Sequence, residues 1–261
     1  QRAALERDLR EAIVLKSFIL YFQAQVDEHG HLTGAEVLVR WQHPERGLIS
    51  PAEFIPLAED TGLIVPLGQW VLKSACEQLS AWSASADTAH LTVAVNVSSR
   101  QLMLPSFVDD VVALLDQTGA NPQRLKLELT ESLLVIDVED VIAKMTALKA
   151  RGVGFSLDDF GTGYSSLSYL KRLPLDQLKI DQGFVRNILC DPDDAAIARM
   201  VVALAVSMDL AVIAEGVETK AQQAFLSGLG CRAFQGYLFG RPMPIEEFEQ
   251  CLPAFLAAKN D

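Results

Sequence analysis

The chain contains 261 residues, half of them hydrophobic and about a fifth charged, and it carries a formal net charge of −12 at pH 7. This size and composition predict one large globular domain with a complete hydrophobic core. The acidic balance argues against long nucleic acids and anionic membrane surfaces as partners, because both require a basic face. It leaves room for a small phosphate ligand that is held by metal ions, since the cations then supply the local positive charge.

No apolar run approaches the roughly 18 residues of a transmembrane helix, and no secretory signal is recognisable. The four cysteines, at positions 76, 190, 231 and 251, show no paired spacing. Free thiols in a reducing cytoplasm are therefore favoured over disulfides. We accordingly expect a cytoplasmic domain, although a longer parent protein could carry a membrane anchor.

Residues 1–15 are predicted to form an amphipathic helix, with Leu5, Leu9, Ala12 and Ile13 set among charged residues. This helix has two interpretations, a connector from an upstream domain or simply the first helix of the same domain. The chain begins with Gln1 and not Met, which agrees with a longer parent. We therefore divide the chain into a connector helix at 1–15 and a barrel domain at 16–261.

Two strands, at 18–26 and 32–41, are joined by a short turn and must therefore be antiparallel. Helices are expected from Pro51 and at 67–84. Beyond them the expected strands are 91–97, 125–130, 153–158, 177–181, 210–215 and 231–238, and the helices are 105–118, 138–150, 164–172, 193–207, 219–229 and 245–258. This alternation is typical of a mainly parallel α/β sheet. Eight strands predict a TIM-like (β/α)8 barrel with its first strand antiparallel to the rest.

Side chains alternate between the two faces of each predicted strand, and one face of nearly every strand is apolar. In a barrel the apolar face packs on the helices and the other face lines the interior. The polar residues that share the inward face are Glu36, Arg40, Asn96, Glu128, Asp158, Lys179, Glu215 and Gln235. Most of them lie near the C-terminal ends of their strands, where barrel enzymes place their catalytic groups.

Several buried carboxylates in one place are costly unless cations neutralise them. The inward bases Arg40, Lys126 and Lys179 are fewer than the acidic side chains Glu36, Glu128, Asp158, Asp181 and Glu215. A structural salt-bridge network is the alternative, but this imbalance favours a metal site. Carboxylate and amide oxygens select Mg²⁺ or Mn²⁺, whereas Ca²⁺ is usually a poor catalyst and is expected to inhibit. The consecutive Asp158 and Asp159 suggest two ions, the usual arrangement for attack on a phosphodiester.

Seven short motifs along the chain are similar to those of one known family. They are Glu36-Val37-Leu38-Val39-Arg40-Trp41, Asn96-Val97-Ser98, Glu128-Leu129-Thr130-Glu131-Ser132, Asp158-Asp159-Phe160-Gly161-Thr162-Gly163, Lys179-Ile180-Asp181, Glu215-Gly216-Val217-Glu218 and Gln235-Gly236-Tyr237. Together and in this order they resemble the EAL domain, the bacterial cyclic di-GMP phosphodiesterase, over nearly the whole chain. Two positions depart from the family, since Val37 replaces the usual Ala and Ala24 stands where Pro is frequent.

The resemblance implies hydrolysis of cyclic di-GMP to linear 5′-pGpG with two Mg²⁺ or Mn²⁺ ions. It assigns the metal ligands as Glu36, Asn96, Glu128, Asp158, Asp159 and Glu215. Lys179 is expected to contact the attacking water, and the general base is either Lys179 or Glu215. The expected catalytic set is thus Glu36, Lys179 and Glu215.

The same resemblance assigns substrate contacts to Gln23, Leu38, Arg40, Asp181 and Gln235, with Arg40 on a phosphate. Glu131 is expected to anchor the loop 160–166 without touching metal. A homodimer and an upstream sensory or GGDEF-type domain are further expectations. Two other functions remain open at this point: an inactive cyclic di-GMP receptor, and a different barrel enzyme such as an enolase-like lyase in which Lys179 removes a carbon-bound proton.

Overall fold

The structure is a computed structural model that describes residues 2–131, 137–161 and 167–257. Its elements in chain order are α1 (Arg2–Leu15), β1 (Phe18–Asp27), β2 (Leu32–His43), β3 (Gly47–Ile49), α2 (Pro51–Thr61), α3 (Ile64–Trp82), β4 (Thr92–Asn96), α4 (Ser99–Leu102), α5 (Phe107–Thr118), the 3₁₀ turn η1 (Pro122–Arg124), β5 (Leu125–Thr130), α6 (Val138–Ala150), β6 (Gly154–Phe160), α7 (Leu167–Leu170), β7 (Gln177–Ile180), α8 (Gln182–Arg186), α9 (Pro192–Ser207), β8 (Ala211–Ala214), α10 (Lys220–Leu229), β9 (Ala233–Gln235), β10 (Met243–Pro244) and α11 (Ile245–Ala257).

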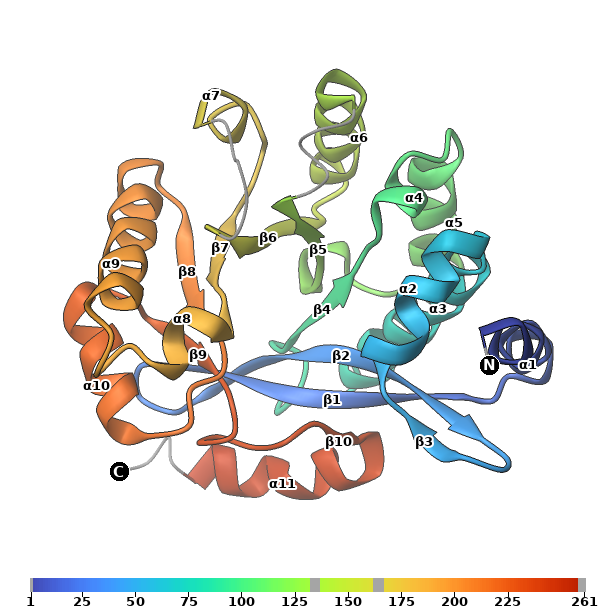
Figure 1. The fold of residues 1–261 in the computed structure, drawn as a ribbon, viewed down its shortest axis with the longest axis horizontal. Coiled ribbons are helices and arrows are strands. Elements are labelled where there is room, and N and C mark those ends of the chain that lie inside the picture. Colours follow the sequence, from blue (N-terminus) through green and yellow to red (C-terminus); the bar gives the residue numbers. More distant parts are fainter. Residues whose placement is uncertain (1, 132–136, 162–166, 258–261) are drawn as a thin grey trace.

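Eight strands form a closed ring in the order β1-β9-β8-β7-β6-β5-β4-β2, and the β1–β2 pairing completes it. β1 is antiparallel to both of its ring neighbours, β2 and β9, whereas the other ring pairs are parallel. The predicted barrel with an antiparallel first strand is therefore confirmed. Figure 1 shows the long β1–β2 ribbon crossing beneath the fan of parallel strands.

The sequence did not predict two short strands, β3 and β10, or two short helices, α4 and α8. β3 extends the end of β2, where Trp41 pairs with Ile49, and β10 pairs with β1 through Phe22 and Met243. α4 and α8 each occupy a loop after a parallel strand. Segments of two to five residues carry too little periodicity to be distinguished from loops. Part of the helix expected at 164–172 lies outside the described residues, and α7 accounts for Leu167–Leu170.

β6 continues two residues beyond the predicted end at 158. Its pairing with β7 shifts register between Leu157 and Phe160, and Asp159 adopts a left-handed φ of 56°. Non-glycine residues rarely adopt this conformation, and it is concentrated at functional sites. The bulge interrupts the strict alternation of the strand just where the two consecutive carboxylates lie.

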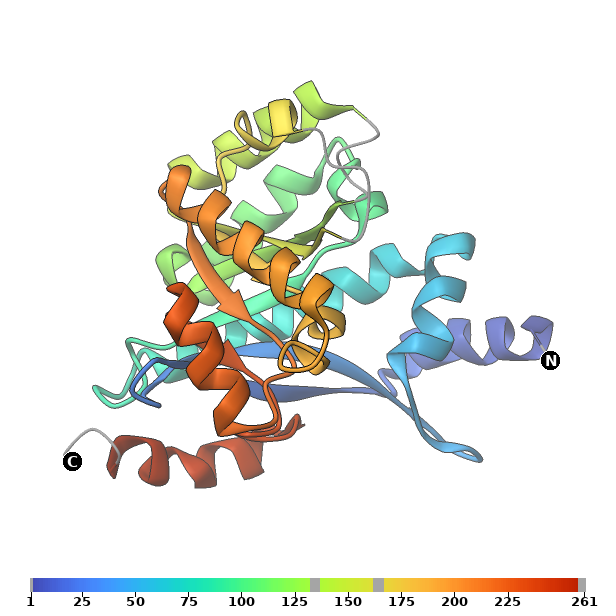
Figure 2. The same ribbon diagram turned by 60° about the vertical axis from the view of Figure 1, so that its left-hand side comes forward.

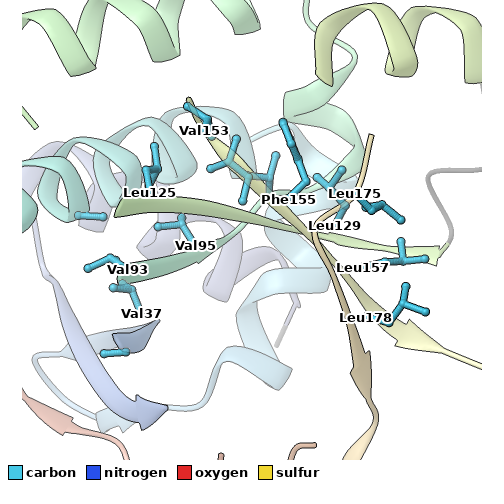
Figure 3. Close-up of a cluster of buried hydrophobic side chains, with 14 of the residues drawn as sticks. Val37, Val93, Val95, Leu125, Leu129, Val153, Phe155, Leu157, Leu175 and Leu178 are labelled. Atoms are coloured by element: carbon cyan, nitrogen blue, oxygen red, sulfur yellow. The ribbon is translucent and has the colours of Figure 1, made fainter. Parts of the chain in front are cut away.

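The outward faces of the parallel strands form an apolar layer beneath the helices. Figure 3 shows side chains of neighbouring strands in this layer, including Val37, Val95, Leu129 and Phe155. Each is at most 2% exposed, and they belong to one core cluster that also contains residues of α3, α5 and α6. The side chain of Val37 packs in this layer, on the face opposite Glu36, as alternation along the strand predicts.

The predicted N-terminal helix forms as α1 and packs on the barrel. Its buried residues Leu9 and Ala12 join a second core cluster that includes Phe18, Trp41 and Phe54. Figure 2 shows α1 beside α2 at the side of the barrel where β3 projects. Within the described residues, no helix has the combination of length and apolar character that a membrane crossing requires.

Candidate active site

Four acidic side chains from four strands or strand ends converge on the ammonium group of Lys179. Its Nζ atom lies 2.5 Å from Glu128 Oε2, 2.5 Å from Glu215 Oε1, 3.3 Å from Asp158 Oδ2 and 3.6 Å from Glu36 Oε2. The side chains of Lys179 and Glu128 are completely buried. The inward faces predicted for β2, β5, β6 and β7 therefore meet at one point, at the C-terminal rim of the parallel strands.

Burial opposes the charge on Lys179, but the surrounding carboxylates hold the pKa of its ammonium well above the ordinary value. Burial raises the pKa of Glu128 to about 8, and the pKa of Glu215 is also raised well above its ordinary value by burial and by neighbouring carboxylates. One ammonium among four carboxylates leaves an excess of buried negative charge. That excess is the electrostatic feature of a site that attracts cations.

Glu36 differs from its neighbours because amide groups hold its carboxylate. Burial disfavours its charge, but Lys179 and the donors of Gln235 and Asn96 lower its pKa. Asn96 Nδ2 donates to Glu36 Oε1 at 2.6 Å, and Gln235 Nε2 donates to Glu36 Oε2 at 2.6 Å. Gln235 Nε2 also donates to Gln23 Oε1 at 3.0 Å. Gln23, Asn96 and Gln235 are thus brought to the same site, as the sequence predicts.

Asp159 and Asp181 lie on the side of the cluster formed by β6 and β7. Burial raises the pKa of Asp159, and the negative charges of Asp158 and Asp181 add to this effect. Asp181 Oδ1 accepts a hydrogen bond from Gly183 N at 2.8 Å and caps α8. This capping is a structural role that exists whether or not Asp181 also contacts a substrate.

Glu131 lies just after β5 and reaches the start of the loop that follows β6. Its side chain is 7% exposed, and its Oε2 accepts a hydrogen bond from Gly161 N at 3.3 Å. Most of the loop that it is expected to anchor, residues 162–166, lies outside the described residues. The contact with Gly161 is compatible with the predicted anchor, which stays a prediction.

Leu38 and Arg40 follow Glu36 at alternate positions of β2, toward the C-terminal end of that strand. Arg40 is half-buried, its guanidinium lies 5.3 Å from the centre of the Tyr21 ring, and burial lowers its pKa. Leu38 lines a pocket of about 290 Å³ between the middle of β2, the C-terminal end of β4 and helices α2 and α3. Asn96 lines the same pocket, so the pocket and the carboxylate cluster adjoin. Its lining is otherwise mainly apolar, as in many small-molecule sites.

The donor set fits hard divalent cations, since it offers carboxylate and amide oxygens and neither His nor Cys. Glu128 Oε1 is buried and has no hydrogen-bond partner among the described residues, so it is available to a cation. In the arrangement seen here the carboxylates surround Lys179. No three His, Cys, Asp or Glu side chains in the described part of the chain are placed as ligands of one ion.

Sequence reasoning did not single out Gln25 or Gln177, two further polar residues near the site. Gln25 Nε2 donates to Gln235 Oε1 at 2.9 Å, and the inward base Lys126, which the sequence did identify, donates through Nζ to Gln177 Oε1 at 2.9 Å. Gln25 shares the inward face of β1 with Gln23, so strand alternation could have identified it. Glu59, which also lines the pocket, comes from helix α2 and has no comparable signal.

Comparisons with known proteins agree with this geometry. A sequence model of the EAL domain matches residues 6–242. The chain is 47% identical over 95% of its length to the bifunctional diguanylate cyclase/cyclic di-GMP phosphodiesterase MucR of Pseudomonas aeruginosa, and 43% identical over 98% of its length to the cyclic di-GMP phosphodiesterase NbdA of the same organism. These matches cover 36% and 33% of those two proteins, so the chain spans about a third of their length.

A solved structure of the PaMucR phosphodiesterase in complex with cyclic di-GMP superposes on this chain with a TM-score of 0.90. The two are 48% identical, and the match covers 94% of this chain and 99% of that one. The similarity thus extends over the whole ring of strands and is not confined to the short motifs.

Proposed function

This chain belongs to the EAL domain family, and from that premise we propose that it hydrolyses cyclic di-GMP to the linear dinucleotide 5′-pGpG. The observation that carries the proposal is the convergence of Glu36, Glu128, Asp158 and Glu215 on Lys179 at the C-terminal rim of the barrel. The phosphodiesterase names of the MucR and NbdA relatives support the same reaction.

We assign the metal-holding role to Glu36, Asn96, Glu128, Asp158, Asp159 and Glu215. When bound, Mg²⁺ or Mn²⁺ would supply positive charge that neutralises phosphate oxygens and makes a water molecule more acidic. Ca²⁺ binds the same kind of oxygen donors but is expected to inhibit. Gln235 donates to one oxygen of Glu36 and Asn96 donates to the other, and Gln23 accepts a hydrogen bond from the same amide group of Gln235, which holds this carboxylate in one orientation.

In the proposed reaction the oxygen of a water molecule forms a new bond to phosphorus and the bond from phosphorus to the 3′ oxygen breaks. The water proton passes to Glu215, or to Lys179 if bound cations lower the pKa of its ammonium, and a proton returns to the departing 3′ oxygen, so one phosphate becomes a 5′ monoester. Lys179 lies within reach of every carboxylate in the cluster, which suits contact with the attacking water.

The remaining substrate contacts follow the layout of the rim. Arg40 would hold a phosphate, since a guanidinium can bind two phosphate oxygens at once. Leu38 and the adjoining pocket would receive one guanine, while Gln23, Gln235 and Asp181 would face the other parts of the dinucleotide. Because the chain spans about a third of its relatives, control by an upstream sensory or GGDEF-type domain and assembly as a homodimer are proposals that rest on family membership.

The test is a turnover assay on cyclic di-GMP with Mg²⁺, Mn²⁺ and Ca²⁺ in parallel, with chromatographic detection of the linear dinucleotide. We expect product with Mg²⁺ or Mn²⁺ and little or none with Ca²⁺. Tight binding of cyclic di-GMP without any product would instead identify a receptor. Absence of both binding and turnover would favour a different barrel chemistry, such as removal of a carbon-bound proton by Lys179.

A further inference from the structure

The pocket beside the carboxylate cluster contains one ionisable side chain. Its apolar wall includes Leu38, Ile55, Ile64 and Leu67, and its polar residues are Asn96, Ser98, Ser99, Gln101 and Thr130. Glu59 of α2 completes the lining and is the only acidic or basic residue among the described residues that form it. In pockets of this kind, a few polar groups placed among apolar walls fix the orientation of a ligand and provide specificity.

The other acidic residues of α2 show why Glu59 is different. Glu53 forms an ion pair with Arg46, and Asp60 forms one with Arg2 of α1, so both have basic partners on the outer surface. Glu59 is partly buried, and no described residue forms an ion pair or a side-chain hydrogen bond with its carboxylate. Gly62, with a left-handed φ of 79°, ends α2 one turn later. Glu59 thus lines a ligand-sized pocket, and its carboxylate accepts no side-chain hydrogen bond from the described residues.

We propose that Glu59 is a specificity-determining residue that selects guanine over adenine in this pocket. The proposal rests on the proposed function, which places one base of the cyclic dinucleotide there. Guanine presents two adjacent donors on its Watson–Crick edge, N1–H and the exocyclic N2–H, and a carboxylate can accept both at once. Adenine presents an unprotonated N1 at the corresponding position, whose lone pair faces the carboxylate unfavourably.

If Glu59 makes no such contact, electrostatics predicts that neutralising its carboxylate changes substrate affinity in the opposite direction. The substrate carries two phosphate charges, so an idle carboxylate nearby repels it, and neutralising that carboxylate should improve binding. If Glu59 accepts hydrogen bonds from guanine, neutralising it should weaken binding. The direction of the change therefore distinguishes base recognition from mere proximity.

The decisive variant is Glu59→Gln, which removes the charge and replaces one acceptor by a donor. That pattern no longer matches guanine, but it matches adenine, whose N6–H donates and whose N1 accepts. The matched control is Glu53→Gln, the same change on the same helix outside the pocket. We expect Glu59→Gln to lower kcat/KM for cyclic di-GMP by roughly 10- to 100-fold, mainly through KM. The ratio of kcat/KM for cyclic di-GMP to that for cyclic di-AMP should fall by at least as much, while Glu53→Gln leaves both unchanged.

An unchanged ratio, or a higher kcat/KM for cyclic di-GMP in Glu59→Gln, would overturn the proposal while leaving the phosphodiesterase function intact. Dissociation constants for the same two dinucleotides, measured by calorimetry on wild type and both variants, test base selection independently of turnover. A wild type that binds cyclic di-GMP selectively but does not cleave it would refute the proposed function alone. A wild type that binds neither dinucleotide would refute both.

Discussion

The two faces of the barrel strands carry different kinds of side chains and tolerate substitution differently. On the outward face Val37, Val93 and Val95 lie side by side and are almost completely buried in a uniform apolar layer (Figure 3). On the inward face of the same two strands and of β5 lie Glu36, Asn96 and Glu128, held by specific hydrogen bonds and ion pairs. The outward face tolerates changes of similar shape, because dispersion and hydrophobic burial are not directional. The inward face does not, because each polar atom depends on a particular partner.

The strongest test of the comparison removes an inward carboxylate. Glu36→Ala and Asp158→Ala should each abolish measurable hydrolysis of cyclic di-GMP, because each deletes a proposed metal ligand next to Lys179. Turnover assays with Mg²⁺ and metal binding by calorimetry would measure the effect. Either variant with activity near wild type would contradict the metal assignment.

Removing the central ammonium should affect both activity and stability. Lys179→Met should lower kcat by roughly 10³-fold or more. Without metal it should also lower the free energy of unfolding by about 3–5 kcal/mol, because buried carboxylates lose their shared cation. Thermal unfolding in EDTA and in Mg²⁺ checks this, and Mg²⁺ should restore more stability to the variant than to wild type.

The matched control for that experiment is Lys126→Met, which removes a partly buried cation that donates to Gln177 and forms no ion pair with a carboxylate of the described residues. Its response to Mg²⁺ should resemble that of wild type. If Lys179→Met unfolds at the wild-type temperature in EDTA, the carboxylates do not depend on Lys179 for compensation.

A smaller effect is expected at the edge of the inward face. Glu131→Ala should reduce kcat roughly 10- to 100-fold, because Glu131 holds Gly161 next to the segment that carries Asp158 and Asp159. Glu131→Gln keeps an acceptor oxygen and should retain most of the activity. Steady-state kinetics at saturating Mg²⁺ separates this role from a loss of metal affinity, and a Glu131→Ala variant as fast as wild type would refute the anchor.

The smallest effect is expected on the outward face. Val37→Ala, which restores the residue usual in the family, should cost about 1–2 kcal/mol of unfolding free energy through lost apolar burial. It should leave kcat unchanged, because Val37 points away from Glu36. Urea denaturation measures the free energy of unfolding, and turnover assays measure kcat. A large loss of activity in a folded Val37→Ala variant would contradict the proposed difference between the two faces.

Much of the fold could be predicted from the chain because its strands alternate regularly and its helices separate them. The β5 and α6 boundaries coincide with the predicted ones, and the inward set was identified by alternation alone. The bulge at Asp159 could not be predicted in this way, since a left-handed residue changes the direction of the chain without leaving a compositional signal. β3 and β10 were missed because such short strands exist only through pairing with β1 and β2.

By itself the sequence determined which side chains face the interior, since alternation along a strand is a local property of the extended backbone. It also carried the ordered motifs from which family membership follows. Only the tertiary structure decided that the inward carboxylates surround the ammonium of Lys179, that Gln25 continues the amide chain to Glu36, and that Glu59 enters the neighbouring pocket from a helix. These contacts depend on the register between strands and on how α2 packs against the strands. Neither is determined by a single segment of the chain.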